Sequence, residues 1–273
     1  MSKCERFFLI IFSLLTIAGA ARATYEYDYP AIRQFIYWVE TDNREALSKH
    51  VEYPLSRSHP IPDIENAEEF IERYDEIFDE KLISMIVNSD LGEDWKGAGY
   101  RGVMLKLGQL WLHYDGELHA INYKSEFEKA KQAKLLDIDR TRLHPSVRKF
   151  NHPVLEWKTK SFIIRIDDMD DWDYRYTSWS IDKQLSDQPD IVLYNGGLHH
   201  QGSGGNHNYD FKHGEHIYRV DVNILGKYGY DELPGDLDIY ESEKLIFRES
   251  AIARWENGRY IPSDASALNL YED

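Results

Sequence analysis

Cysteine is almost missing from this sequence, which holds one, Cys4, in 273 residues. A single thiol excludes an internal disulfide and a zinc site built from several cysteines. Beyond residue 20 no apolar run approaches the roughly 18 residues that a membrane span needs. Basic residues are also scarce, with 32 Lys and Arg against 48 Asp and Glu and a net charge of −16. Such a charge repels phosphate backbones, so the composition argues against a nucleic-acid partner.

The N-terminus has the pattern of an export signal. Lys3 and Arg6 precede the apolar stretch FFLIIFSLLTIAGA, and Ala21-Arg22-Ala23 then gives the small-x-small motif of a cleavage site. We therefore predict a signal peptide at residues 1–23 and a periplasmic or secreted protein with no membrane contact after cleavage. An uncleaved anchor is less favoured, because the run is short for a bilayer. Cleavage would leave 29 basic and 47 acidic residues, a charge of −18.

Residues 24–125 have the pattern of an α+β domain. Ile32, Phe35, Ile36 and Val39 share one helical face, and Asn66 precedes the acid-rich segment AEEFIERYDEI as a helix cap would. A second short helix is expected around LISMI. The period then changes to two, which predicts three antiparallel strands in GVMLKLG, QLWLHYD and ELHAINYKS. Helices followed by a strand meander are typical of the α+β class.

Three segments of this region, EYPLSR, NAEEFIERYDEIFDEKLISMI and YRGVMLKLGQLWLHYDGELHAINY, resemble the nuclear transport factor 2-like superfamily over residues 25–125. The resemblance implies a cystatin-like α+β cone, in which helices pack into a curved sheet and leave a pocket. That superfamily contains isomerases, dehydratases, carriers and interaction modules, so the fold does not select a function. The polar side chains expected to line the cone are Asp75, Asp79 and His113.

Residues 126–152 are locally basic and predict a helix followed by a linker, and residues 153–273 predict an all-β sandwich or small barrel. Seven short alternating segments support the second prediction: KSFIIRIDD, DYRYTSWSI, DIVLYNGGL, NYDFKHG, HIYRVDVNIL, DLDIYES and EKLIFRES. This domain also resembles uncharacterised secreted bacterial β-rich proteins that carry a GSGGNH turn.

Five histidines fall within GGLHHQGSGGNHNYDFKHGEH, residues 196–216. If two strands pair there, His207 and His216 would meet across the hairpin, with His213 near its turn, as weak candidates for metal ligands. Their spacing matches no known ligand signature, and the glycines lack the lysine of a phosphate-binding loop. Ser203 has no nucleophile motif around it. We therefore predict tight glycine turns, and no cofactor.

A second cluster combines carboxylates with aromatic rings between residues 167 and 179. Its members are Asp167, Asp168, Asp170, Asp171, Trp172, Asp173, Tyr174, Tyr176 and Trp179. The EF-hand spacing of a calcium loop is missing, and an acidic hairpin tip is a simpler interpretation. Aromatic side chains ringed by charge are also typical of protein interfaces, although at least half of these rings are expected to pack in a β core.

The sequence as a whole favours a binding protein over an enzyme, because no catalytic constellation can be assembled from it. The preferred hypothesis is an exported acidic protein of the immunity or inhibitor type that captures a basic protein. One alternative is a small-ligand carrier or an isomerase- or hydrolase-like enzyme in the N-terminal cone. The second alternative is a metal-binding β domain.

Overall fold

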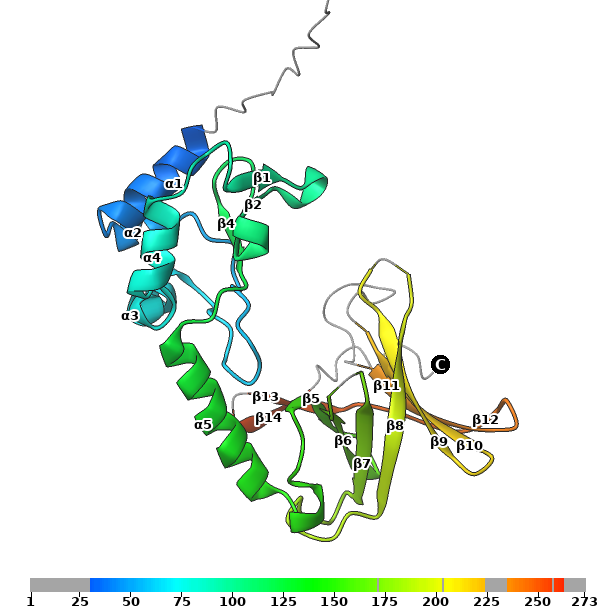
Figure 1. Cartoon of the computed structure of the whole chain (residues 1–273). Helices are drawn as coiled ribbons and strands as arrows, with labels where there is room; N and C mark the ends of the chain where they lie inside the picture. Colours follow the sequence, from blue (N-terminus) through cyan, green and yellow to red (C-terminus); the bar gives the residue numbers. More distant parts are fainter. Residues whose placement is uncertain (1–29, 171, 203, 224–234, 257, 263–273) are drawn as a thin grey trace, which may run out of the picture.

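A computed structural model describes residues 30–170, 172–202, 204–223, 235–256 and 258–262. The predicted signal peptide, Asp171 and Ser203 lie outside the described residues. Within the described ranges, no helix is long and apolar enough to cross a membrane. Both helices and strands are abundant, so the chain belongs to the α+β class (Figure 1).

The N-terminal domain packs four helices beside a small antiparallel sheet (Figure 1). The helices are α1 (Pro30–Glu40), α2 (Arg44–Ser48), α3 (Ala67–Ile77) and α4 (Glu80–Val87). The sheet has the order β1 (Trp95–Gly97), β2 (Val103–Leu105), β3 (Leu110–Leu112) and β4 (Leu118–Ile121), with short 3-10 turns at Gly99–Arg101 and Lys106–Gly108. The predicted first helix, the helix after Asn66, the helix around LISMI and the three predicted strands are therefore confirmed.

Local capping and apolar burial explain these helices. The side chain of Asn66 accepts a hydrogen bond from the backbone N–H of Glu69, and Asp79 caps α4 through the N–H of Leu82. Each cap satisfies one of the donors that a helix N-terminus leaves unpaired. The apolar faces meet in one core, which includes Phe35, Phe70, Tyr74, Leu82, Leu105 and Leu112.

A 17-residue helix, α5 (Glu126–Arg142), connects the N-terminal domain to the large sheet (Figure 1). It starts at Ser125, whose side chain accepts from the N–H of Glu128 and donates to the carbonyl of Glu76. Arg57 forms a buried ion pair with Glu128, with 2.6 Å between Nη2 and Oε2. These contacts fix the first turn of α5 against the N-terminal domain, and the 3-10 turn η3 (Pro145–Val147) follows the helix.

The C-terminal strands form one ten-stranded antiparallel sheet in the order β12-β11-β10-β9-β8-β7-β6-β5-β13-β14. Figure 1 shows this sheet curled into a half-barrel. Its strands are β5 (His152–Lys158), β6 (Phe162–Asp168), β7 (Tyr174–Ser180), β8 (Ile191–His200), β9 (His207–His213), β10 (His216–Val222), β11 (Gly235–Glu241), β12 (Lys244–Ser250), β13 (Ala253–Glu256) and β14 (Arg259–Pro262). All seven predicted strands are present, in one continuous sheet rather than in two facing sheets. Each strand from β5 to β11 pairs with the next one in the chain, and strand twist curls the sheet.

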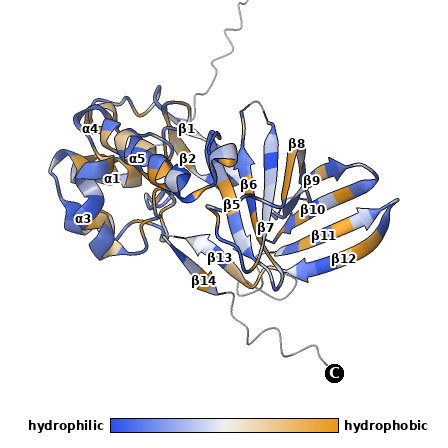
Figure 2. Cartoon of the chain, turned by 90° about the horizontal axis from the view of Figure 1, so that it is seen from below, coloured by the Kyte–Doolittle hydropathy of each residue, from blue (hydrophilic) through white to orange (hydrophobic). Residues whose placement is uncertain are grey.

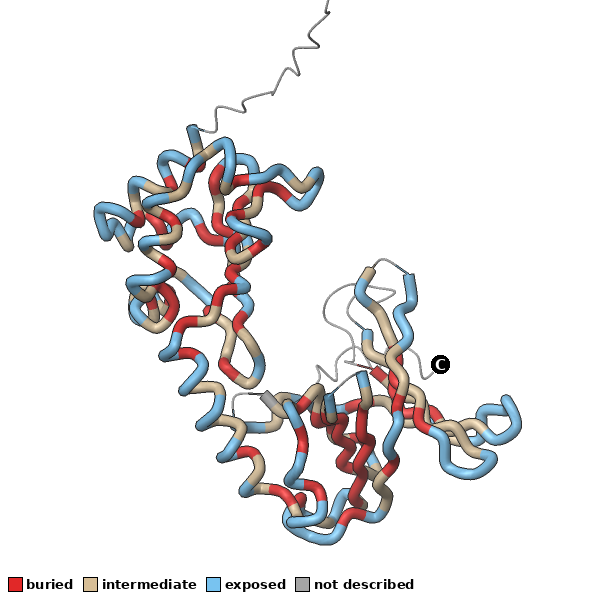
Figure 3. The backbone as a smooth tube through the Cα atoms, viewed as in Figure 1, coloured by how far each residue is buried: buried red, intermediate tan, exposed pale blue. Residues whose placement is uncertain are grey.

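The first strands of this sheet are covered on both faces. On one face, Ile164 and Tyr176 join a core that extends to Phe211 and Val220. On the other face, Ile163 and Trp179 pack against residues that follow α5, including Val147. Figure 3 shows burial concentrated in this part of the sheet, whereas the distal hairpins are more exposed. Figure 2 shows polar and apolar segments alternating along the outer strands. Strands that are packed on both faces hold the polar side chains that they carry in fixed positions.

Candidate functional site

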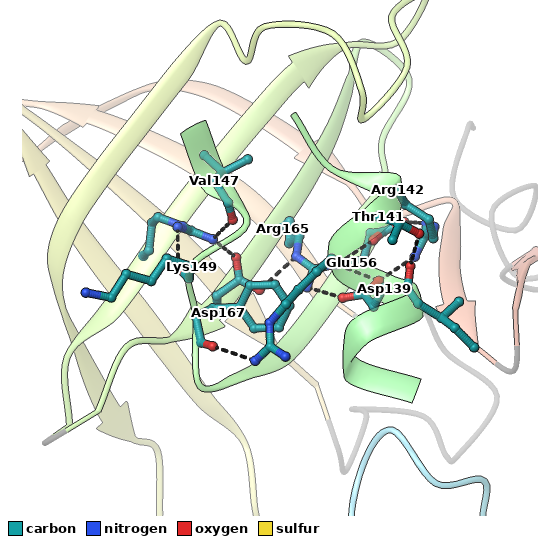
Figure 4. Close-up of polar contacts among 12 residues, drawn as sticks. Asp139, Thr141, Arg142, Val147, Lys149, Glu156, Arg165 and Asp167 are labelled. Atoms are coloured by element: carbon teal, nitrogen blue, oxygen red, sulfur yellow. Dashed lines mark hydrogen bonds and ion pairs between the residues drawn. The ribbon is translucent and has the colours of Figure 1, made fainter. Parts of the chain in front are cut away.

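A buried ionic network lies between α5 and the strands β5 and β6 (Figure 4). At its centre Arg165, with 1% of its side chain exposed, donates to three carboxylates. The nitrogen-to-oxygen distances are 2.8 Å to Asp167, 3.0 Å to Glu156 and 2.5 Å to Asp139. Asp139 comes from the last turns of α5, Glu156 from β5 and Asp167 from β6. Arg165 therefore joins the helix to two strands of the sheet.

Strand register places these charges together. Glu156 is the cross-strand partner of Arg165, and Asp167 is the partner of Arg175. Because residues two apart share a face, Arg165 and Asp167 both point toward α5. Arg175 donates to Asp167 at 2.6 Å and also to the backbone carbonyls of residues 147 and 149. The ionic network therefore lies on the face of the sheet that packs against α5, next to the apolar core on that face.

Two more side chains complete the carboxylate contacts. Arg142 donates to Asp139 at 2.8 Å and to Glu156 at 2.7 Å. Tyr260 donates its hydroxyl to the same oxygen of Glu156, at 2.7 Å. Burial raises the pKa of Tyr260, and the negative charge of Glu156 raises it further. Burial alone would lower the pKa of Arg165, but the charges of Asp167 and Asp139 hold it above its ordinary value, so the guanidinium stays charged.

A cavity of about 520 Å³ opens above this network. One wall is the loop of residues 56–63 from the N-terminal domain, and the others come from α5, β5, β6 and the β13–β14 hairpin. Ile61, Leu135, Leu155 and Trp255 contribute apolar surface, whereas Glu156 and Arg165 form part of the charged floor. The volume lies within the usual range for small-molecule sites, and boundaries between domains are a common place for them.

The charged groups of this cavity are already paired within the protein. The guanidinium of Arg142 lies 3.6 Å from the ring centre of Trp255 while it bonds Asp139 and Glu156. Arg57 is held by Glu128 and by the carbonyl of Ile121. His59 lies at the solvent-accessible edge, where desolvation by the surrounding protein lowers the pKa of its imidazole. The arrangement offers an apolar surface over oriented, fixed charges.

Among the described residues, the predicted acidic and aromatic cluster at residues 167–179 is divided between the protein core and the surface. Tyr174, Tyr176 and Trp179 are buried, with 8%, 1% and 0% of their surface exposed. Tyr174 and Tyr176 share one face of β7 and pack in one core, whereas Trp179 packs in the core on the other face. Trp172 is 80% exposed on the hairpin. Of the acids, Asp167 belongs to the ionic network, Asp168 lies 3.3 Å from His152, Asp170 is exposed and Asp173 is half-buried.

The three polar residues expected inside an N-terminal cone lie apart. Asp75 is exposed and pairs with Arg44 at 2.8 Å. Asp79 caps α4 and accepts a hydrogen bond from the hydroxyl of Tyr123. His113 lies beside Glu52 on the surface of the domain. The structure therefore does not bring Asp75, Asp79 and His113 to one site.

The histidines of residues 196–216 follow the register of two hairpins. His207 lies opposite His200 and Val222, whereas His216 lies opposite His213. The expectation that His207 and His216 meet is wrong, because they occupy opposite ends of the β9–β10 pair. The prediction of glycine turns is confirmed: Gly202 and Gly205 have φ of 76° and 86°, and the N–H of Gln201 donates to the carbonyl of Asn206.

Apart from Asp167, the residues of the network and the cavity were not predicted as site residues from the sequence. One signal was present, because Arg165 interrupts the apolar run FIIRI of a strand that is otherwise buried. A charge in such a strand requires a buried partner. Two of its partners, Asp139 on α5 and Glu156 on β5, lie elsewhere in the chain, and nothing in their local sequence distinguishes them from surface acids. Comparisons with protein-family models, curated proteins and solved structures find no match to this chain.

Proposed function

We propose that the protein is an exported, non-enzymatic binding protein whose ligand is an amphipathic small molecule. The observation that carries the proposal is the cavity of about 520 Å³ between the loop 56–63, α5 and the start of the large sheet. Its walls suit an apolar body, and its charged floor suits one polar group. Export is proposed from the N-terminal sequence alone.

Binding is favoured over catalysis because the carboxylates of the cavity floor are engaged in ion pairs, and the histidine of the lining, His59, lies at the edge of the cavity. A general base must take up a proton, and pairing with a cation disfavours protonation of a carboxylate. The carboxylates of Asp139 and Glu156 accept hydrogen bonds from Arg165 and Arg142. Fixed charges of this kind orient a ligand dipole without exchanging a proton.

The proposal is tested with 8-anilinonaphthalene-1-sulfonate, a fluorescent probe that has an apolar ring system and one polar group. We expect saturable fluorescence enhancement with one probe per chain. Ile138 lines the cavity from α5 and is 51% exposed, so Ile138→Trp should fill the space without disturbing the core. This variant should weaken probe binding at least about fivefold, since the bulky ring competes for the same volume.

Phe127→Trp is the matched control, because Phe127 lies on the same helix, is 55% exposed and does not line the cavity. It should bind the probe like the unmodified protein. Equal affinity of Ile138→Trp and Phe127→Trp would show that the probe binds elsewhere and would reject the cavity as the site.

Capture of a basic protein is a second candidate, supported by the net charge of −16. Opposite charge accelerates encounter and makes it sensitive to salt. A pull-down with the immobilised protein should then recover a basic partner at low salt and lose it at high salt. Recovery that is independent of salt would count against this mode.

For residues 25–125 we also propose membership of the nuclear transport factor 2-like superfamily, supported by the order of helices before an antiparallel sheet.

A further inference from the structure

Glu52, His113 and His119 converge on the surface of the N-terminal domain, away from the residues that line the cavity. The Nε2 atom of His113 lies 2.8 Å from Oε2 of Glu52, and Nδ1 of His119 lies 2.6 Å from the same oxygen. The two imidazole rings are 4.5 Å apart between their centres. One potential ligand atom from each residue therefore lies within 4.8 Å of the other two.

The backbone holds all three residues in place. Glu52 donates its N–H to the carbonyl of Leu118, at the start of β4, and Val51 forms a parallel bridge with Leu118. His113 follows β3 and donates its N–H to the carbonyl of Glu117, whereas His119 lies within β4. The three side chains therefore project from one hydrogen-bonded hairpin and the chain bridged to it, which limits the conformational entropy lost on binding.

We infer that Glu52, His113 and His119 form a divalent metal site, with zinc as the ion that fits best. Two imidazole nitrogens and one carboxylate oxygen are ordinary zinc ligands. Ligand atoms around a tetrahedral zinc lie roughly 3.4 Å apart at bond lengths of about 2.0–2.2 Å. The present separations need only small side-chain rotations to reach that arrangement.

Accessibility and charge also suit a metal. The side chains of Glu52, His113 and His119 are 50%, 35% and 40% exposed, so an ion can reach them and retain water or an external ligand in a fourth position. The carboxylate supplies a negative charge that two neutral imidazoles would lack.

The experiment is a calorimetric titration of the untagged full chain with zinc chloride. We expect one ion per chain and at least about tenfold weaker binding in His113→Ala and in His119→Gln, because loss of even an indirect partner of a ligand costs about 10–100-fold. His119→Gln keeps a polar side chain of similar reach, so it guards against misfolding. Both variants should retain the circular dichroism spectrum and probe binding of the unmodified protein.

His216→Ala is the matched control. His216 is 38% exposed, lies 3.5 Å from Glu241 and faces His213 across a hairpin, but among the described residues three ligand atoms do not converge there. The His216→Ala variant should bind zinc with the same affinity as the unmodified protein. The proposal is overturned if no stoichiometric zinc is bound, or if the affinity is the same in His113→Ala, His119→Gln and His216→Ala.

Discussion

Arg165 shows how one side chain can join a helix to a sheet. Its guanidinium contacts Asp139 of α5, Glu156 of β5 and Asp167 of β6, and it is almost fully buried. Burial of a charge is costly unless partners and hydrogen bonds compensate for it. The three carboxylates provide that compensation, and each of them also accepts from a second arginine, Arg142 or Arg175. Stability at this position is therefore a property of the group and not of one ion pair.

Arg165→Met should lower the free energy of unfolding by about 3–5 kcal/mol, because it leaves buried carboxylates without their shared cation. Urea denaturation monitored by tryptophan fluorescence measures the change. Lys129→Met is the control, because it removes an exposed ion pair between Lys129 and Glu126 on α5. It should lower the free energy of unfolding by less than about 1 kcal/mol. Similar losses in both variants would contradict a specific role for the buried network.

Elements with local signals were predicted from the sequence, and elements that depend on distant pairing were not. Alternation identified the seven strands from β6 to β12, and capping identified α3. The strand β5 was not predicted, because the linker was placed up to Pro153 and the first alternating segment was found only at KSFIIRIDD. The β13–β14 hairpin was also missed, since β13 is held by pairing with β5 nearly a hundred residues away. The network and cavity combine residues from these same elements, so their proximity has no local signature.

Alanine substitutions at the adjacent glycines Gly196 and Gly197 test how tightly β8 is packed. A Cβ atom at Gly196 would lie 2.1 Å from the ring of Phe211, which is fully buried, so the core would have to shift to admit it. Gly196→Ala should therefore destabilise the protein by about 1–3 kcal/mol, as overpacking does. The same substitution at Gly197 meets only the exposed side chain of His199. Gly197→Ala should leave the thermal midpoint unchanged or raise it, and a larger loss there than at Gly196 would contradict the packing.

At the scale of the whole molecule, the cavity is assembled from both ends of the chain. Its walls run from Ser56 in the N-terminal domain to Gly258 after β13, and α5 holds the two parts together. The buried pair of Arg57 and Glu128 anchors the N-terminal wall to the helix, and the network around Arg165 anchors the helix to the sheet. The proposed ligand site therefore exists only when both domains are present.

A crystal structure of the full chain with bound 8-anilinonaphthalene-1-sulfonate tests the central claim most directly. We predict that the ring system of the probe lies in the cavity against Leu135 and Trp255, with its sulfonate directed toward the charged floor. The ionic network around Arg165 should remain intact, because the ligand adds to paired charges and does not replace them. A cavity filled by the protein's own side chains, with the probe bound elsewhere, would contradict the account.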